Sequence, residues 1–223
     1  MSIRPLNGIR RAVASRMALS KKTIPHLYIG VAADVTGVGH LRKGPGPGLT
    51  TYIAGALRDA LIANPALNGV WTETGPDLAD EVVLSIAVAT SEGIVAPSIA
   101  LPPGMDLGTM DVEIQELVQR ARSKRLRPSD MAGAGFSLSN IGPLGVTVGY
   151  SIVTPPQLAV LCAGATYMQL AARDGQVFER EMIQLSLSAD HRAVDGEQSC
   201  QFLRDVKGNL EAAVSSSTVG APS

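Results

Sequence analysis

Apolar and polar positions alternate between Met182 and Ser188, near the C-terminal end of the chain. This period of two predicts a β-strand with one buried face. The period then lengthens, because apolar side chains recur every three or four positions between Glu197 and Val214, as in a helix. The apolar positions of this second stretch are Phe202, Leu203, Val206, Leu210 and Val214. Residues 190–196, Asp-His-Arg-Ala-Val-Asp-Gly, therefore lie on a predicted strand-to-helix turn.

The same two periods divide the rest of the chain into helices and strands. We expect helices near residues 9–17, 51–63 and 107–121, and strands near 27–34, 82–89, 94–99, 136–140 and 158–162. Asp174-Gly175 is typical of a hairpin turn that leads into the 182–188 strand. Interleaved helices and strands indicate an α/β fold. We expect one domain over residues 1–214 and a polar, disordered tail at 215–223.

The composition of the 223 residues is that of a globular protein, with 45% hydrophobic residues and a mean hydropathy of +0.17. The apolar runs are too short to span a bilayer, so we expect no membrane association. A net charge of −1 provides no general attraction to nucleic acid, and no cysteine or histidine cluster predicts a metal site. Cys162 and Cys200 match no pairing motif, which is typical of reduced thiols in a cytoplasmic protein.

Basic residues are concentrated at the N-terminus, where positions 1–33 hold six lysines and arginines and no acidic residue. An arginine-rich helix face can bind the phosphates of a nucleotide such as coenzyme A. The candidate contacts are Arg10, Arg11 and Lys21. A solvated helix face and an organellar transit peptide are the alternatives. The segment runs directly into a strand without a small-residue linker, which argues against the transit peptide.

His191 is the chain's best candidate for a general base, since the ordinary pKa of an imidazole lies near neutral pH. The preceding strand would hold it rigidly, and a carboxylate four positions on, Asp195, can fix the turn. A structural interpretation competes with this one. Asp195 and Gln198 fit a capping box at a helix start, and a lone histidine at a strand end is more often structural. Spacing alone favours the structural interpretation.

Several short motifs, in the same order, resemble the catalytic core of the dihydrolipoamide acyltransferases, the acyl-transfer components of the 2-oxo acid dehydrogenase complexes. The resemblance covers nearly the whole chain. The motifs are residues 8–17, Pro25-His26, Asp34-Val35-Thr36, residues 65–68, residues 92–97, residues 136–142, Pro155-Pro156-Gln157 and residues 190–196.

The resemblance implies an α/β two-layer sandwich with a mixed β-sheet, like that of chloramphenicol acetyltransferase. It also implies a homotrimer with an active site between subunits. By motif, His191 is similar to the family's base, Ser139 to the hydroxyl that stabilises the oxyanion, and Asp195 to the carboxylate that supports the turn. Acyl-CoA, such as acetyl-CoA, would be the co-substrate, with no metal and no lipoyl group on this chain.

Two departures from the family guide the choice of acceptor. Family members that serve the dehydrogenase complexes carry lipoyl and subunit-binding domains, which this sequence lacks, and they end in an apolar segment where this one ends in a polar tail. We therefore expect a stand-alone enzyme that acetylates the hydroxyl of a small molecule, similar to the acetyltransferases of tetronate antibiotic biosynthesis. The alternatives are the core of a dihydrolipoamide acyltransferase and a non-catalytic trimeric scaffold. The presence of His191, Ser139 and Asp195 argues against the scaffold.

Overall fold

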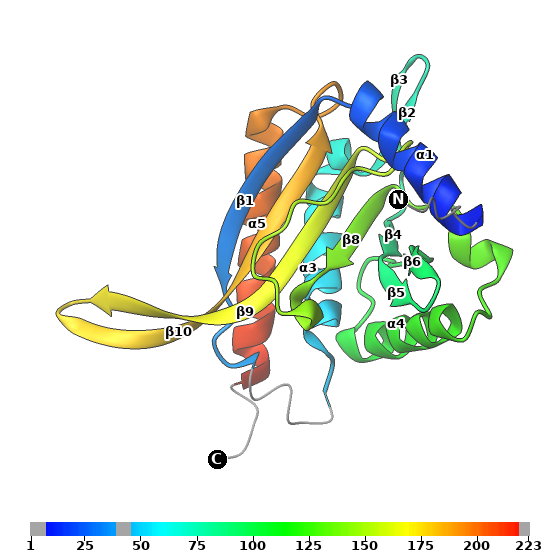
Figure 1. Ribbon diagram of the computed structural model, residues 1–223. Helices are drawn as coiled ribbons and strands as arrows, with labels where there is room; N and C mark the ends of the chain where they lie inside the picture. Colours follow the sequence, from blue (N-terminus) through cyan, green and yellow to red (C-terminus); the bar gives the residue numbers. More distant parts are fainter. Residues whose placement is uncertain (1–7, 39–45, 219–223) are drawn as a thin grey trace, which may run out of the picture.

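A six-stranded mixed sheet runs through the computed structural model, which describes residues 8–38 and 46–218 (Figure 1). The β8 strand is parallel to both of its neighbours, and the remaining pairs are antiparallel. This arrangement confirms the expected mixed sheet. The strands in spatial order are β1 (His26–Asp34), β10 (Gln176–Asp190), β9 (Ala159–Arg173), β8 (Phe136–Asn140), β4 (Val83–Ile86) and β7 (Ser98–Ala100).

Two helices, α3 (Leu49–Ala63) and α5 (Gly196–Thr218), pack side by side and cover one face of the sheet (Figure 1). No described helix is long and apolar enough to cross a membrane. The remaining elements are α1 (Gly8–Thr23), α4 (Leu107–Arg122), the short helices η1 (Pro65–Leu67), η2 (Pro128–Met131) and η3 (Gly142–Leu144), and the hairpins β2 (Gly69–Thr72)–β3 (Gly75–Leu78) and β5 (Val88–Thr90)–β6 (Gly93–Val95).

The pairing register gives the sheet two different faces. Leu138, Leu161 and Leu185 belong to the large core cluster that also contains the buried side chains of α3 and α5. The next residues along the three strands point the other way. They form a row of small polar side chains, because Ser139 pairs with Cys162 and Cys162 with Ser186. The apolar core thus lies between the sheet and the two helices, and the opposite face of the sheet carries polar groups.

The strands expected at 82–89 and 94–99 are each divided in two. β4 stays in the main sheet, but the chain leaves the sheet after Ile86, and β5 pairs with β6. Pro97, which has no N–H for a ladder, separates β6 from β7. The sequence period continues through the break because Val88 is also buried in the core. The expectation of two continuous strands was therefore wrong.

The β9–β10 hairpin is longer than its sequence pattern predicts. The expected strands at 158–162 and 182–188 extend to residues 173 and 176, and their outer halves project beyond the sheet as a two-stranded ribbon (Figure 1). The turn at Asp174-Gly175 is confirmed, with φ of 53° and 76°, as a two-residue hairpin turn requires. The β2–β3 hairpin was not expected. The helix α5 continues to Thr218, beyond the expected boundary at 214.

Substitution of Phe202 measures how much the packing of α5 against the sheet contributes to stability. Its side chain is fully buried, and its ring centroid lies 5.5 Å from that of Phe136 on β8. We expect Phe202→Ala to lower the free energy of unfolding by about 3–5 kcal/mol, because it leaves a cavity between the two layers. The measurement is the midpoint of urea-induced unfolding, with the denaturant dependence of the free energy of unfolding (the m-value) unchanged. Leu170→Ala, at a side chain that is 69% exposed on the ribbon, is the control and should cost less than about 0.5 kcal/mol.

Candidate functional site

The turn after β10 fixes the backbone of His191 and leaves its side chain exposed. The His191 N–H donates to the Pro25 carbonyl at 3.0 Å. The Asp190 carbonyl accepts from both Ala193 and Val194, each at 3.0 Å. No described residue forms a hydrogen bond or ion pair with the imidazole in this single chain. The histidine is thus held by its main chain, and its ring is open to another molecule.

An ion pair between a buried carboxylate and a partly exposed guanidinium spans the same turn. The Asp190 side chain is fully buried and accepts from the Arg192 backbone N–H at 3.0 Å, from its Nε at 2.9 Å and from its Nη2 at 2.5 Å. The side-chain bonds that Arg192 donates to the carboxylate raise the pKa of its guanidinium. A carboxylate without water must be paired and hydrogen-bonded, so Asp190 strongly favours this conformation. His191 is the one residue that separates the two partners along the chain.

Two side chains that lie next to this turn were not predicted from the sequence as part of the site. The Arg192 guanidinium lies 4.1 Å from the ring centroid of Trp71 on β2. His26, which pairs with Asp190 across β1 and β10, accepts from the Val153 N–H at Nε2 (3.1 Å), while its Nδ1 lies 2.9 Å from the Ile24 carbonyl oxygen. An imidazole that donates through one nitrogen and accepts through the other is neutral. The Pro25-His26 motif was a sequence signal for His26, but no pattern predicted the contact between Trp71 and Arg192.

Ser139 is half-buried on β8, on the polar face of the sheet. Its neighbour on β9 is Cys162, whose thiol interacts with the hydroxyls of Ser151 and Ser139. Burial raises the pKa of this thiol, so it is protonated at neutral pH and is not a competing nucleophile. Both Cys162 and Cys200 are free cysteines, as expected.

One chain does not bring His191 and Ser139 together. Through Cys162, Ser139 is level with Ser186 on β10, and His191 comes five residues later. At ~3.3 Å per residue, the two are separated by roughly 16 Å along the strands, and two strand spacings add about 10 Å across them. A reaction that uses both side chains therefore needs His191 from one copy of the chain and Ser139 from another.

Asp195 begins α5. Its carboxylate accepts from the Gln198 N–H at 2.8 Å, and the Gln198 side chain accepts from the Asp195 N–H at 3.0 Å. This reciprocal pair confirms the capping box that was the structural alternative in the sequence. The cap fixes the start of the helix directly after the turn, four positions beyond His191.

The three basic candidates on α1 do not form a single phosphate-binding site. Arg10 and Lys21 are separated by about 16 Å along the helix at ~1.5 Å per residue, with the exposed Arg11 next to the first. Lys21 is near the C-terminal end of α1, where its ammonium donates to the Tyr28 hydroxyl and lies 5.0 Å from that ring's centroid. Tyr28 pairs with Ser188 of β10, so Lys21 is linked through Tyr28 to the strand that carries the turn.

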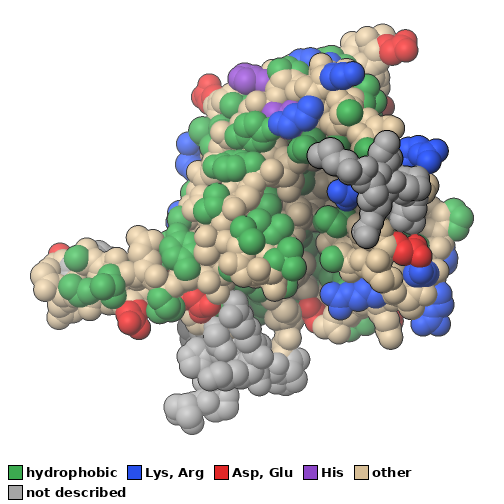
Figure 2. All heavy atoms as spheres, in the orientation of Figure 1, with side chains coloured by type: hydrophobic (Ala, Val, Ile, Leu, Met, Phe, Trp, Pro, Cys, Tyr) green, Lys and Arg blue, Asp and Glu red, His purple; other side chains and the backbone are tan. Residues whose placement is uncertain are grey.

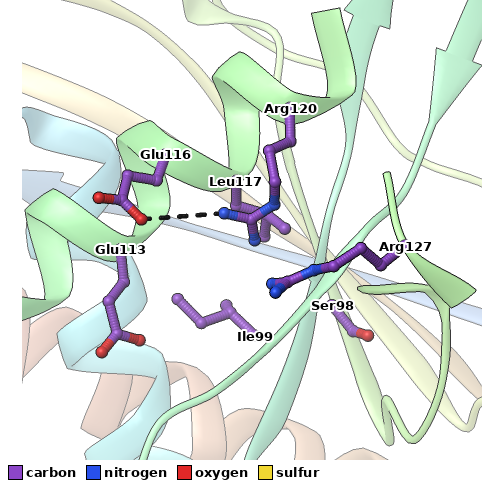
Figure 3. A pocket seen from close by; sticks show the side chains of 7 residues that line it. All are labelled: Ser98, Ile99, Glu113, Glu116, Leu117, Arg120 and Arg127. Atoms are coloured by element: carbon purple, nitrogen blue, oxygen red, sulfur yellow. Dashed lines mark ion pairs between the residues drawn. The ribbon is translucent and has the colours of Figure 1, made fainter. Parts of the chain in front are cut away.

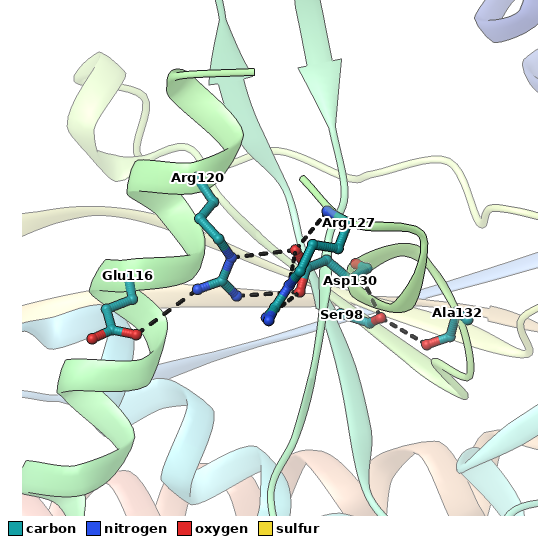
Figure 4. A network of polar contacts seen from close by, with 6 residues as sticks. All are labelled: Ser98, Glu116, Arg120, Arg127, Asp130 and Ala132. Atoms are coloured by element: carbon teal, nitrogen blue, oxygen red, sulfur yellow. Dashed lines mark hydrogen bonds and ion pairs between the residues drawn. The ribbon is translucent and has the colours of Figure 1, made fainter. Parts of the chain in front are cut away.

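A hollow of about 260 Å³ at the other edge of the sheet is a rival site (Figure 3). Arg120 of α4 and Arg127, just before η2, line it, together with Glu113, Glu116 and residues of β7. Both guanidiniums bind Asp130, at 3.2 and 3.1 Å, and Arg120 also faces Glu116 (Figure 4). The carboxylates of Glu113, Glu116 and Asp130 outnumber the two arginines, and both arginines already pair with Asp130. The hollow is therefore an ion-pair network rather than a phosphate site.

Comparison with known families and proteins yields one consistent match. The model of the family described as 2-oxoacid dehydrogenases acyltransferase (catalytic domain) matches residues 2–216. A dihydrolipoyllysine-residue acetyltransferase component of the pyruvate dehydrogenase complex from Rickettsia felis is 30% identical over 218 residues, which are 93% of this chain and 53% of that protein. Component 3 of the mitochondrial complex from Arabidopsis thaliana is 31% identical over 93% of this chain and 41% of its own. The chain thus spans about half, or less, of these relatives.

Solved structures agree with the sequence matches. A probable dihydrolipoamide acetyltransferase from Listeria monocytogenes superposes with a TM-score of 0.89 at 29% identity, covering 95% of each chain. The dihydrolipoamide acetyltransferase of Azotobacter vinelandii gives a TM-score of 0.87 at 27% identity, covering 96% of this chain and 93% of its own. Chloramphenicol acetyltransferase gives 0.55 at 16% identity, covering 88% and 94%, which shows a shared fold. The expected fold is confirmed.

Asp130 provides a pH test of the ion-pair network. Hydrogen bonds from the backbone and side chain of Arg127 and from the side chain of Arg120 hold the pKa of this carboxyl well below its usual range. A lowered pKa stabilises the fold above about pH 4, and the contribution is lost as the pH falls through the folded-state pKa. We expect Asp130→Asn to melt several degrees below the wild type at pH 7. The difference should narrow below about pH 4, and an equal difference at pH 7 and pH 3 would contradict this explanation.

Proposed function

The chain belongs to the family of 2-oxoacid dehydrogenase acyltransferase catalytic domains, and we propose that it exchanges an acyl group between coenzyme A and a dihydrolipoyl thiol. In the direction from acyl-CoA, His191 takes the proton of the attacking thiol. The sulfur adds to the thioester carbonyl, and the Ser139 hydroxyl donates to the resulting oxyanion. The intermediate expels the thiolate of coenzyme A, which recovers the proton from the imidazolium. The products are the acylated thiol and free coenzyme A.

One correspondence carries the assignment of these residues. The Azotobacter vinelandii structure comes from an investigation of the role of a serine, a histidine and an asparagine in that enzyme's catalytic mechanism. Its histidine follows the serine by 52 positions, and the asparagine follows the histidine by four. His191 follows Ser139, and Asp195 follows His191, by the same two spacings. An asparagine and an aspartate both offer a side-chain oxygen that can cap a helix. The replacement of asparagine by Asp195 therefore preserves the cap that follows the turn.

The separation of His191 and Ser139 within one chain supports a site between subunits. We propose a homotrimer in which each site takes His191 from one protomer and Ser139 from the next. The polar face of the sheet also exposes apolar side chains of the segment that crosses it, and Figure 2 shows such side chains gathered on the visible face. They include Leu144, Val146, Val148 and Tyr150, which are 44–74% exposed. Burial of such side chains favours association.

The basic side of α1 is the proposed contact for the phosphates of coenzyme A. Lys21 is linked to the His191 turn through Tyr28 and β1. Arg10 and Arg11 would meet a different part of a long ligand, since they are about 16 Å away along the helix.

The dihydrolipoyl acceptor is preferred to the hydroxyl of a small molecule. Relatives that cover 93% of this chain include dihydrolipoyllysine-residue acetyltransferases. The preference for a tetronate-like hydroxyl was based on domains that the sequence lacks and on its polar end. Because the chain spans about half of its relatives, neither premise favours one acceptor over the other. No comparison supports a role in antibiotic biosynthesis.

An acceptor assay with two variants tests the chemistry. With acetyl-CoA as donor, we expect free coenzyme A to appear with dihydrolipoamide and not with small hydroxylic acceptors. His191→Ala should lower turnover by 10² to 10⁴, the usual contribution of a positioned base. Ser139→Ala should lower kcat by about 10² to 10³ with little change in donor binding, because the hydroxyl acts on the oxyanion.

Ser216→Ala, at an exposed serine far along α5, is the control and should keep full activity. Full activity of His191→Ala would refute the assignment of the base. Release of coenzyme A with hydroxylic acceptors alone would favour the small-molecule reaction, and no release with any acceptor would favour the scaffold.

Mixed trimers test the site between subunits. When His191→Ala and Ser139→Ala chains are co-expressed in equal amounts with different tags, about a quarter of the sites in random trimers combine an intact histidine with an intact serine. One site in three is native in every trimer that contains both variants, so we expect the purified mixed trimers to recover about a third of wild-type activity. Co-expression of His191→Ala with the double variant cannot create a native site and is the control. Mixed trimers no more active than the Ser139→Ala trimer would contradict a shared site.

A further inference from the structure

Trp71 is the single tryptophan of the chain, and it is on the β2–β3 hairpin rather than on the sheet that carries the His191 turn. Its indole is half-buried, and the Arg192 guanidinium lies 4.1 Å from its ring centroid. A guanidinium at this distance from an indole is attracted to the ring face. The Arg192 side chain, which is one-third exposed, thus contacts both the Asp190 carboxylate and an aromatic ring.

The backbones of Trp71 and Asp190 form hydrogen bonds to the same short segment, residues 156–158. The Trp71 N–H donates to the Pro156 carbonyl at 2.7 Å, and the Asp190 N–H donates to the Leu158 carbonyl at 2.8 Å. Between them, the buried Gln157 side chain donates to Ser85 and to the Ala134 carbonyl. The indole and the carboxylate therefore keep a fixed relation to each other, and the guanidinium fits between them.

From this arrangement we infer that Trp71 is a positioning residue for His191. The indole keeps the Arg192 guanidinium on Asp190, and the Asp190–Arg192 pair encloses the residue that carries the imidazole. Without the ring, Arg192 can leave the carboxylate for solvent, and the His191 backbone then loses one of its restraints. The inference rests on the proposed function, in which His191 is the base.

The kinetic test compares three variants of the assembled protein, with acetyl-CoA and dihydrolipoamide as substrates. Trp71→Ala should lower kcat roughly 10-fold, because a displaced base loses its alignment with the thiol. The KM of each substrate should change by less than about twofold, since no substrate contact is removed. Trp71→Phe keeps an aromatic face and should restore most of the activity. Leu78→Ala removes an exposed apolar side chain from the same hairpin and should match the wild type.

A kcat of Trp71→Ala equal to that of the wild type would overturn the inference. The same holds for a loss that Trp71→Phe does not restore, or for one that appears in KM alone. His191→Ala, measured in parallel, separates the two hypotheses. If it retains full turnover, the proposed function fails, whatever Trp71 does. If it is inactive and Trp71→Ala is not impaired, only the positioning role fails.

Fluorescence provides a readout that does not depend on activity or on the folding of Trp71→Ala. The emission of the wild type comes from Trp71 alone among tryptophans. We expect Arg192→Lys, which cannot place a planar group on the ring, to shift the emission and to increase quenching by acrylamide. Leu78→Ala should leave both unchanged. Identical emission and quenching in Arg192→Lys and the wild type would show that the stack does not form in solution.

Discussion

The buried carboxylate of Asp190 is the constraint on which the local structure depends. An isolated charge at this depth would cost several kcal/mol, so the chain must bring a cation to it. Arg192 is the nearest cation in sequence, and it reaches the carboxylate only if the backbone turns within the intervening residue. That residue is His191. The electrostatics of its two neighbours therefore decide the conformation of the histidine before any substrate is present.

The rest of the fold makes this turn possible by keeping the two faces of the sheet distinct. On the helix side, leucines of β8, β9 and β10 meet α3 and α5, while the other side carries Ser186, Ser188 and Asp190. Small side chains allow the segment after β8 to cross this face closely. At Gly164, an added Cβ would lie 1.9 Å from the Thr147 carbonyl oxygen, so a larger residue cannot occupy the position. The crossing segment in turn supplies the backbone that anchors Trp71 and Asp190.

Local signals predicted much of this structure. The alternation before residue 190, the helical spacing after 196, the Asp174-Gly175 turn and the Asp195–Gln198 cap each depend on neighbouring residues, and each is present. The division of the 82–89 strand could not be predicted, because Val88 is buried by α4 and the core just as it would be in the main sheet. Nor could the stack of Arg192 on Trp71 be predicted, since the two residues meet only through the register of distant strands.

Ser139 and Asp190 share one face of the sheet, and it is the face on which the crossing segment leaves apolar side chains in solvent. The two features have a common explanation in our proposal. A neighbouring protomer that covers Tyr28 and Tyr150, which pack edge to face at 5.5 Å, would also bring its own side chains to this surface. A single chain exposes its histidine and separates it from its serine. Association would then complete the site and bury the apolar surface in the same step, so that stability and chemistry depend on the same contact.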